Sequence, residues 1–99
     1  MRDFVQIDER DNVAVAVRDL AAGSEALGAA PTGAPLHLAV VEDVPCFHKV
    51  ALEDIPAGGV VIKYGEYIGV ALADIHAGQY VHVHNVASSD ALRESAGAR

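Results

Sequence analysis

A nine-residue pattern, V-A-[VL]-x-D-[LI]-x-A-G, occurs three times in this 99-residue chain, at residues 15–23, 50–58 and 70–78. A solenoid would repeat at a fixed period, whereas these copies are unequally spaced. Each copy opens with the apolar residues of a short strand. Its Asp can accept hydrogen bonds from backbone N–H groups just ahead, and its final Gly permits the positive φ of a tight reversal. The pattern therefore predicts strand, polar turn and strand, reused inside one compact domain.

The segments between the copies also predict short strands and turns. Residues 63–69 place two glycines around alternating aromatic residues, which indicates a hairpin with Gly65-Glu66 at its tip. Residues 28–35 are a loop insertion by composition, residues 36–41 are apolar enough for a strand, and residues 88–99 are a polar tail. No long 3.6-residue period is present. We therefore expect an all-β barrel or clip with Gly turns, and a small α+β domain is the alternative.

Composition sets limits on the core and on the binding partners. A chain of 99 residues is one domain by size, and an apolar fraction of 52% with only 5% aromatic residues favours a thin core. The net charge of −7 argues against nucleic acid or an anionic membrane as partner. The charged N-terminus is unlike a secretion signal, and the single cysteine fits a reducing compartment. We therefore expect a cytoplasmic protein.

Histidines gather late in the sequence. His82 and His84 are two apart, which in a strand would place both imidazoles on one face. Such a pair can bind a divalent metal with a third ligand, relay a proton or grip an anion. The alternative is two polar residues on a solvent-facing strand. His48 next to Lys49 similarly indicates proton transfer or anion binding, and the alternative is a solvated pair at the edge of a loop.

The remaining polar candidates have simpler interpretations. Lys63 ends an apolar segment, where it can reach a carboxylate or phosphate, or can simply protect a strand edge. The aspartates of the three copies are expected to be turn residues, because each precedes x-A-G. Cys46, His37 and His76 are expected to have no chemical role.

Several of these segments together resemble a known family. H-K-V-A-L at residues 48–52, D-I-P-A-G at 54–58, V-I-K-Y-G at 61–65 and V-H-V-H-N at 81–85 occur in the order found in the N-terminal domain of altronate and galactarate dehydratases. The resemblance covers about residues 8–87, taken as the domain core. The chain departs from the family pattern at Phe47, where a Gly usually precedes His-Lys, and in its insertion.

The resemblance implies a SAF domain of the β-clip fold. In some members this domain is a separate small subunit beside a large catalytic one, as in sulfolactate sulfo-lyase. The family eliminates water or sulfite from hydroxy acids with a divalent metal, iron, manganese or magnesium. We therefore expect a small dehydratase subunit that completes a partner's active site, with the metal held mainly by that partner. A homo-oligomer is the alternative assembly. The alternatives are a free-standing module that binds sugar acids or proteins, and a purely structural clip.

The resemblance also implies site residues. His48, Lys63, His82 and His84 are the predicted catalytic residues, and Lys49, Tyr64 and Asn85 are the predicted substrate-binding residues.

Overall fold

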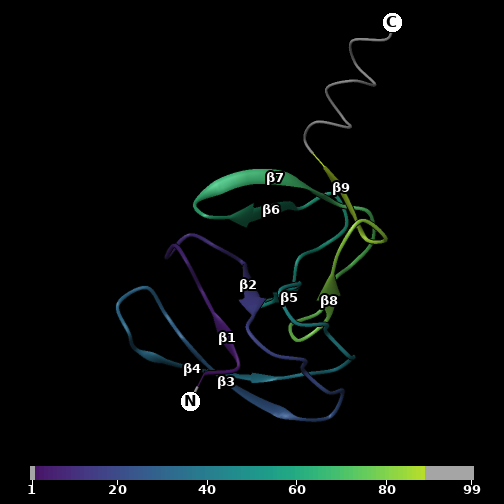
Figure 1. The fold of residues 1–99 in the computed structure, drawn as a ribbon. Helices are drawn as coiled ribbons and strands as arrows, with labels where there is room; N and C mark the ends of the chain where they lie inside the picture. The colour runs from purple at the N-terminus through teal and green to yellow at the C-terminus, as the bar shows by residue number, and fades with distance from the viewer. Residues whose placement is uncertain (1, 89–99) are drawn as a thin grey trace, which may run out of the picture.

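The fold is that of a computed structural model, which describes residues 2–88 (Figure 1). The strands of this part of the chain are β1 (Phe4–Val5), β2 (Val13–Ala16), β3 (Glu25–Ala29), β4 (Pro35–Ala39), β5 (Lys49–Ala51), β6 (Val60–Lys63), β7 (Glu66–Ala71), β8 (Tyr80–Val81) and β9 (Val86–Ser88). The prediction of an all-β domain with short strands is confirmed. Residues 2–88 include no helix of the length and hydropathy that a membrane span needs.

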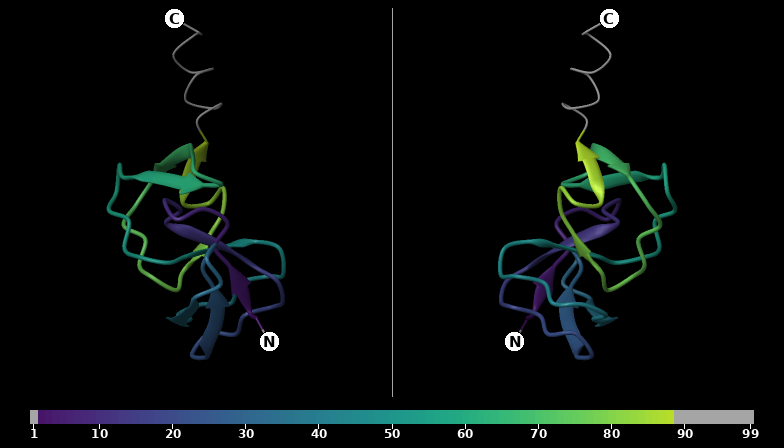
Figure 2. Two further views of the ribbon diagram at one scale, coloured as in Figure 1. Left: turned by 90° about the vertical axis from the view of Figure 1, so that its left-hand side faces the viewer. Right: turned by 90° about the vertical axis from the view of Figure 1, so that its right-hand side faces the viewer.

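The strands form two sheets. One has six strands in the order β4-β3-β1-β2-β5-β8, and the other has three in the order β6-β7-β9. All neighbours are antiparallel except β1 and β3, which run parallel. The three-stranded sheet lies across one end of the molecule, as the side views show (Figure 2). Short strands that change direction at Gly turns therefore wrap around a small interior.

The core consists of two clusters, one on each side of the central β2–β5 pair. Residues alternate between the faces of a strand, so Ala14 of β2 and Val50 of β5 join one cluster while Val13 and Ala51 join the other. Phe4 is fully buried in the first cluster. The packed core therefore begins before residue 8, the first residue of the predicted domain core.

The repeated turns pair with one another across the molecule. Ile55 and Ile75 exchange backbone N–H···O bonds of 2.8 Å each. Asp54 accepts a bond of 2.9 Å from the backbone N–H of Ala77, and Asp74 accepts the reciprocal bond of 2.9 Å from Ala57. The predicted turn role of these aspartates is confirmed, but the prediction that each would cap its own turn was wrong. Each aspartate joins its turn to a second copy, so the repeat works in pairs.

The first copy pairs with a degenerate fourth copy that the sequence pattern did not reveal. Asp19 accepts from the backbone N–H of Cys46 at 2.8 Å, and Asp43 accepts from Ala22 at 2.9 Å. In this copy, residues 43–47, Phe47 occupies the place of the turn glycine and has a φ of 69°, close to the 81° of Gly58. A left-handed conformation costs a bulky residue about 1–3 kcal/mol. Phe47 is thus a strained residue.

Four predicted boundaries were wrong by a few residues. The hairpin tip is Tyr64-Gly65, one residue earlier than predicted, because both residues adopt the positive φ (56° and 72°) of a type I′ turn. The predicted loop 28–35 is shorter, since β3 continues to Ala29 and β4 begins at Pro35, and β4 ends at Ala39. Of the predicted tail, Ser88 belongs to β9 and residues 89–99 lie outside the described part.

Candidate functional site

Four aromatic side chains meet near the start of β5 and around the short strand β8. The Oη of Tyr80 lies 2.6 Å from Nδ1 of His48, a hydrogen-bond distance. The ring of His82 stacks on Tyr80 at 5.7 Å between centroids and lies 5.0 Å from the ring of His48. The ring of His84 lies 5.3 Å from Tyr80. We call His48, Tyr80, His82 and His84 the histidine cluster. It contains three of the chain's five histidines.

The strand pairing explains how His48 and Tyr80 meet. β5 pairs with β8, with Val50 opposite Tyr80 and Lys49 opposite Val81. His48 directly precedes β5, and its backbone carbonyl accepts from Ala16 of β2 at 2.9 Å. Two segments that are 32 residues apart are therefore held in register by the sheet.

His82 and His84 lie in a turn, so the prediction of a strand carrying both on one face was wrong. A bend at His82 and a turn over residues 83–85 together join β8 to β9. Asn85 closes it, because its Oδ1 accepts from the backbone N–H of His82 at 3.0 Å and its Nδ2 donates to the carbonyl of Tyr80 at 2.8 Å. Val83, which a strand would have buried, is 76% exposed. Both imidazoles nevertheless reach Tyr80.

Lys49 lies near His82 of the cluster and Lys63 lies near Lys49, and these are the only lysines of the chain. Burial lowers the pKa of Lys49, and the nearby charge of Lys63 lowers that pKa further. Among residues 2–88 neither lysine forms an ion pair with a carboxylate. The Nζ of Lys63 instead lies over the ring of Tyr64, 4.6 Å from its centre. Two unpaired cations close together favour the binding of an anion.

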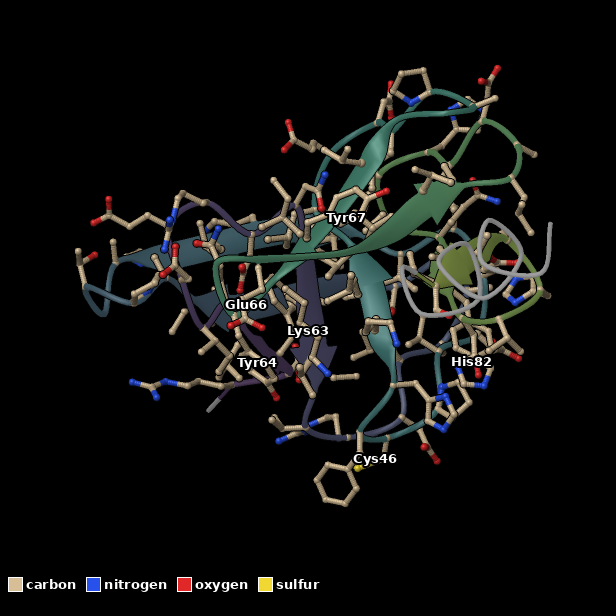
Figure 3. All side chains as sticks on the ribbon, turned by 90° about the horizontal axis from the view of Figure 1, so that it is seen from above. Cys46, Lys63, Tyr64, Glu66, Tyr67 and His82 are labelled. Carbon is tan, nitrogen blue, oxygen red and sulfur yellow. The ribbon has the colours of Figure 1, made fainter. Side chains whose placement is uncertain are left out.

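The hairpin that carries Lys63 and Tyr64 is held from the start of β2. Asp11 accepts from the backbone N–H of Gly65 at 2.7 Å. The buried amide of Asn12 accepts from the N–H of Ile62 and donates to the carbonyl of Val60, both at 2.8 Å. In Figure 3, Lys63 and Tyr64 lie next to each other, and His82 lies apart from them. The Asp-Asn pair at the start of the domain therefore has a structural use, which is to fix Lys63.

His82 lies in surroundings that disfavour the protonated form of its imidazole. Loss of hydration lowers its pKa, and the positive charge of Lys49 lowers it further, with smaller contributions from His48 and His84. A lowered pKa keeps the imidazole neutral at neutral pH, so that it can accept a proton. The pKa of His82 is lower in the folded state than in the unfolded state. Protonation of His82 therefore destabilises the fold as the pH falls from the unfolded-state pKa toward the folded-state pKa.

Replacement of Lys49 by methionine is expected to raise the pKa of His82, because it removes the largest charge effect while keeping an unbranched side chain. The measurement is an NMR titration of the histidine ring protons. Lys63→Met is the matched control, since the charge of Lys63 acts on Lys49 and is not among the causes of the His82 shift. A His82 pKa that is the same in the wild type and in Lys49→Met would contradict this account.

The structure brings most of the predicted site residues to one region. Lys49 and His82 line a cleft of about 210 Å³ together with the apolar side chains of Ile68, Val83 and Val86. Asn85, predicted to bind substrate, has both polar side-chain atoms engaged within the turn. Tyr80 was missed by the sequence reading. The sequence feature that could have pointed to Tyr80 is its spacing, because Tyr80, His82 and His84 occur at every second position.

No metal centre is formed by this part of the chain. Within residues 2–88, no three His, Cys, Asp or Glu side chains are grouped so that they could hold a metal ion. The clustered imidazoles have a tyrosine between them and the lysines beside them. These residues do not fit a metal site of their own. A larger hollow of about 410 Å³ adjoins Asp19 and Asp43, but carboxylates at its edge disfavour an anionic ligand.

The family model and the similar proteins point to the same family. Residues 2–89 match the family model described as the altronate/galactarate dehydratase SAF domain. Altronate dehydratase of Escherichia coli (strain K12) is 49% identical over 82 residues, which cover 83% of this chain but 16% of that protein. The (2R)-sulfolactate sulfo-lyase subunit alpha of Chromohalobacter salexigens is 39% identical over 90 residues, covering 85% of this chain and 92% of that subunit. The chain thus spans a small part of the dehydratase and most of the sulfo-lyase subunit.

Proposed function

Because the chain belongs to the altronate/galactarate dehydratase SAF domain family, we propose that it completes the active site of a hydroxy-acid dehydratase or related lyase. The main catalytic groups would lie in a larger partner chain. The observation that carries this proposal is the position of Lys49 beside the histidine cluster and within reach of the charge of Lys63, with no carboxylate partner for either lysine among residues 2–88 of this acidic protein.

The chemistry of elimination matches these side chains. A base must take the proton on the carbon next to the substrate carboxylate, and the electrons of that C–H bond then form an enolate-like intermediate. The intermediate is stabilised by positive charge, and an acid protonates the leaving hydroxyl, which departs as water. In this proposal Lys49 and Lys63 hold the carboxylate. Neutral His82 is suited to accept a proton, and His48, hydrogen-bonded to Tyr80, is suited to carry one.

The substrate class proposed is a small hydroxy acid. A substrate carboxylate would neutralise the two adjacent cations, and the apolar wall of the cleft would contact its carbon chain. The divalent metal of the reaction is proposed to be held by the partner, because residues 2–88 form no group of ligands for it. We also propose that the complex works in the cytoplasm.

Reconstitution tests the proposal. The chain is used to isolate its partner from the native cell extract, the partner is identified by mass spectrometry, and the two are then purified separately. We expect elimination of water or sulfite from hydroxy acids by the mixture and neither activity from the small chain alone. A chain that binds a sugar acid by itself, without a catalytic partner, would instead support the free-standing binding module.

A further inference from the structure

We propose that Phe47 is the apolar anchor by which this chain docks into its catalytic partner, beside the histidine cluster. This inference rests on the proposed function, because the partner it names is the larger catalytic chain. It differs from that proposal in assigning a docking role to a residue that has no part in the chemistry.

The backbone of Phe47 has a conformation that its side chain disfavours. The three other copies of the turn have glycine at this place, with φ between 81° and 89°, and Phe47 has 69°. Its N–H donates to the carbonyl of Ala16 at 2.7 Å, so the surrounding turn holds it there. Glycine would satisfy the same geometry without strain. Strained residues of this kind persist mainly where they serve a function.

Packing within the chain does not explain the phenylalanine. Its side chain is 78% exposed, the largest fraction among the exposed large apolar residues of the described part. Val83 follows at 76% and lies between His82 and His84, just as Phe47 lies directly before His48. Two highly exposed apolar side chains are thus direct sequence neighbours of cluster histidines. They contribute little to the stability of the isolated chain and would be covered in a complex.

Charge supports the catalytic chain as the occupant. The lysines next to this face lack carboxylate partners within residues 2–88, although the whole chain carries a net charge of −7. A partner whose active site contains an anionic hydroxy acid complements them, whereas in a two-fold dimer of this chain the same lysines would face each other. Aromatic anchors inserted into an apolar pocket commonly dominate such interfaces. We therefore expect an apolar pocket for Phe47 at the edge of the partner's active site.

The test is Phe47→Gly, because it has opposite effects on the isolated chain and on the complex. Urea unfolding of the isolated chain is expected to show an unchanged or higher midpoint, since the strain is removed. The Kd for the purified catalytic chain, measured by calorimetry, is expected to rise by about 30-fold or more. Phe47→Asn, which also tolerates positive φ, is expected to give the same loss of affinity, and Phe47→Tyr is expected to retain binding.

Leu27→Ala is the matched control. Leu27 is an exposed apolar residue on β3, which is separated from β5 by β1 and β2 in the sheet, and its replacement is expected to leave the Kd unchanged. An unchanged Kd in Phe47→Gly, with wild-type binding intact, would overturn the inference and leave the proposed function standing. A wild-type chain that binds no catalytic partner would overturn both. A wild-type homodimer that dissociates in Phe47→Gly would identify a second copy as the occupant and also overturn the inference.

Discussion

The elimination rate of the assembled enzyme is expected to fall by a factor of about 100 or more when the four predicted catalytic side chains are replaced by alanine together. These side chains are His48, Lys63, His82 and His84. General acid–base groups and positive charges at a developing anion each contribute factors of about 10²–10³. The variant is expected to fold, because none of the four lies in the buried core. Initial rates under saturating partner, with circular dichroism of the small chain, are the measurements.

The chain supplies a matched control for this experiment. His37 and His76 are exposed histidines outside the histidine cluster, and their double replacement by alanine removes imidazoles without touching the site. That variant is expected to keep the wild-type rate. A quadruple variant that binds the partner and also keeps the wild-type rate would contradict a catalytic role for these side chains. The domain would then be a binding or structural module.

Single variants then separate binding from chemistry. Lys49→Met is expected to raise KM more than it lowers kcat, because in the proposed site it removes a charge that would hold the carboxylate in the ground state and in the transition state alike.

Tyr80→Phe is expected to change the pH profile of kcat, because in the proposed site Tyr80 would position His48 through their hydrogen bond. A purely structural role for Tyr80 would lower the rate equally at every pH.

Gly28→Ala is expected to be the most destabilising single substitution considered, at about 3 kcal/mol or more, a large part of the stability of a domain of this size. Gly28 lies opposite Phe4 in the parallel pairing of β1 and β3. A Cβ at residue 28 would clash with Cε2 of Phe4, whose ring is fully buried. The measurement is urea unfolding followed by circular dichroism.

A second glycine distinguishes this clash from a general glycine effect. Gly33 has a φ of 89°, and a Cβ there would meet nothing within 4 Å. Gly33→Ala is therefore expected to cost only about 1–2 kcal/mol, from the backbone conformation alone. Phe4→Leu is expected to recover part of the loss in the Gly28→Ala background, which a double-mutant cycle measures. Equal costs at Gly28 and Gly33 would contradict the close contact with Phe4.

Local chemistry in the sequence was sufficient for the fold class and for the type of each turn. The repeated apolar pairs predicted strands, the Asp-x-x-Ala-Gly pattern predicted turns, and the family resemblance predicted most of the side chains that meet at the site. These features depend on the conformational preferences of residues close together in the chain. The same reasoning placed the tip of the β6–β7 hairpin one residue late, because it did not expect positive φ at Tyr64.

Only the tertiary structure decided what depends on contacts between distant segments. It paired the turns and so redirected Asp54 and Asp74 to each other's copies, and it revealed residues 43–47 as a fourth copy with a strained Phe47. It also turned the V-H-V-H-N segment back on itself through Asn85, while Tyr80 joined His82 to His48. Sequence spacing gives the order of these residues. Their approach follows from sheet register and from reciprocal hydrogen bonds, which no single segment encodes.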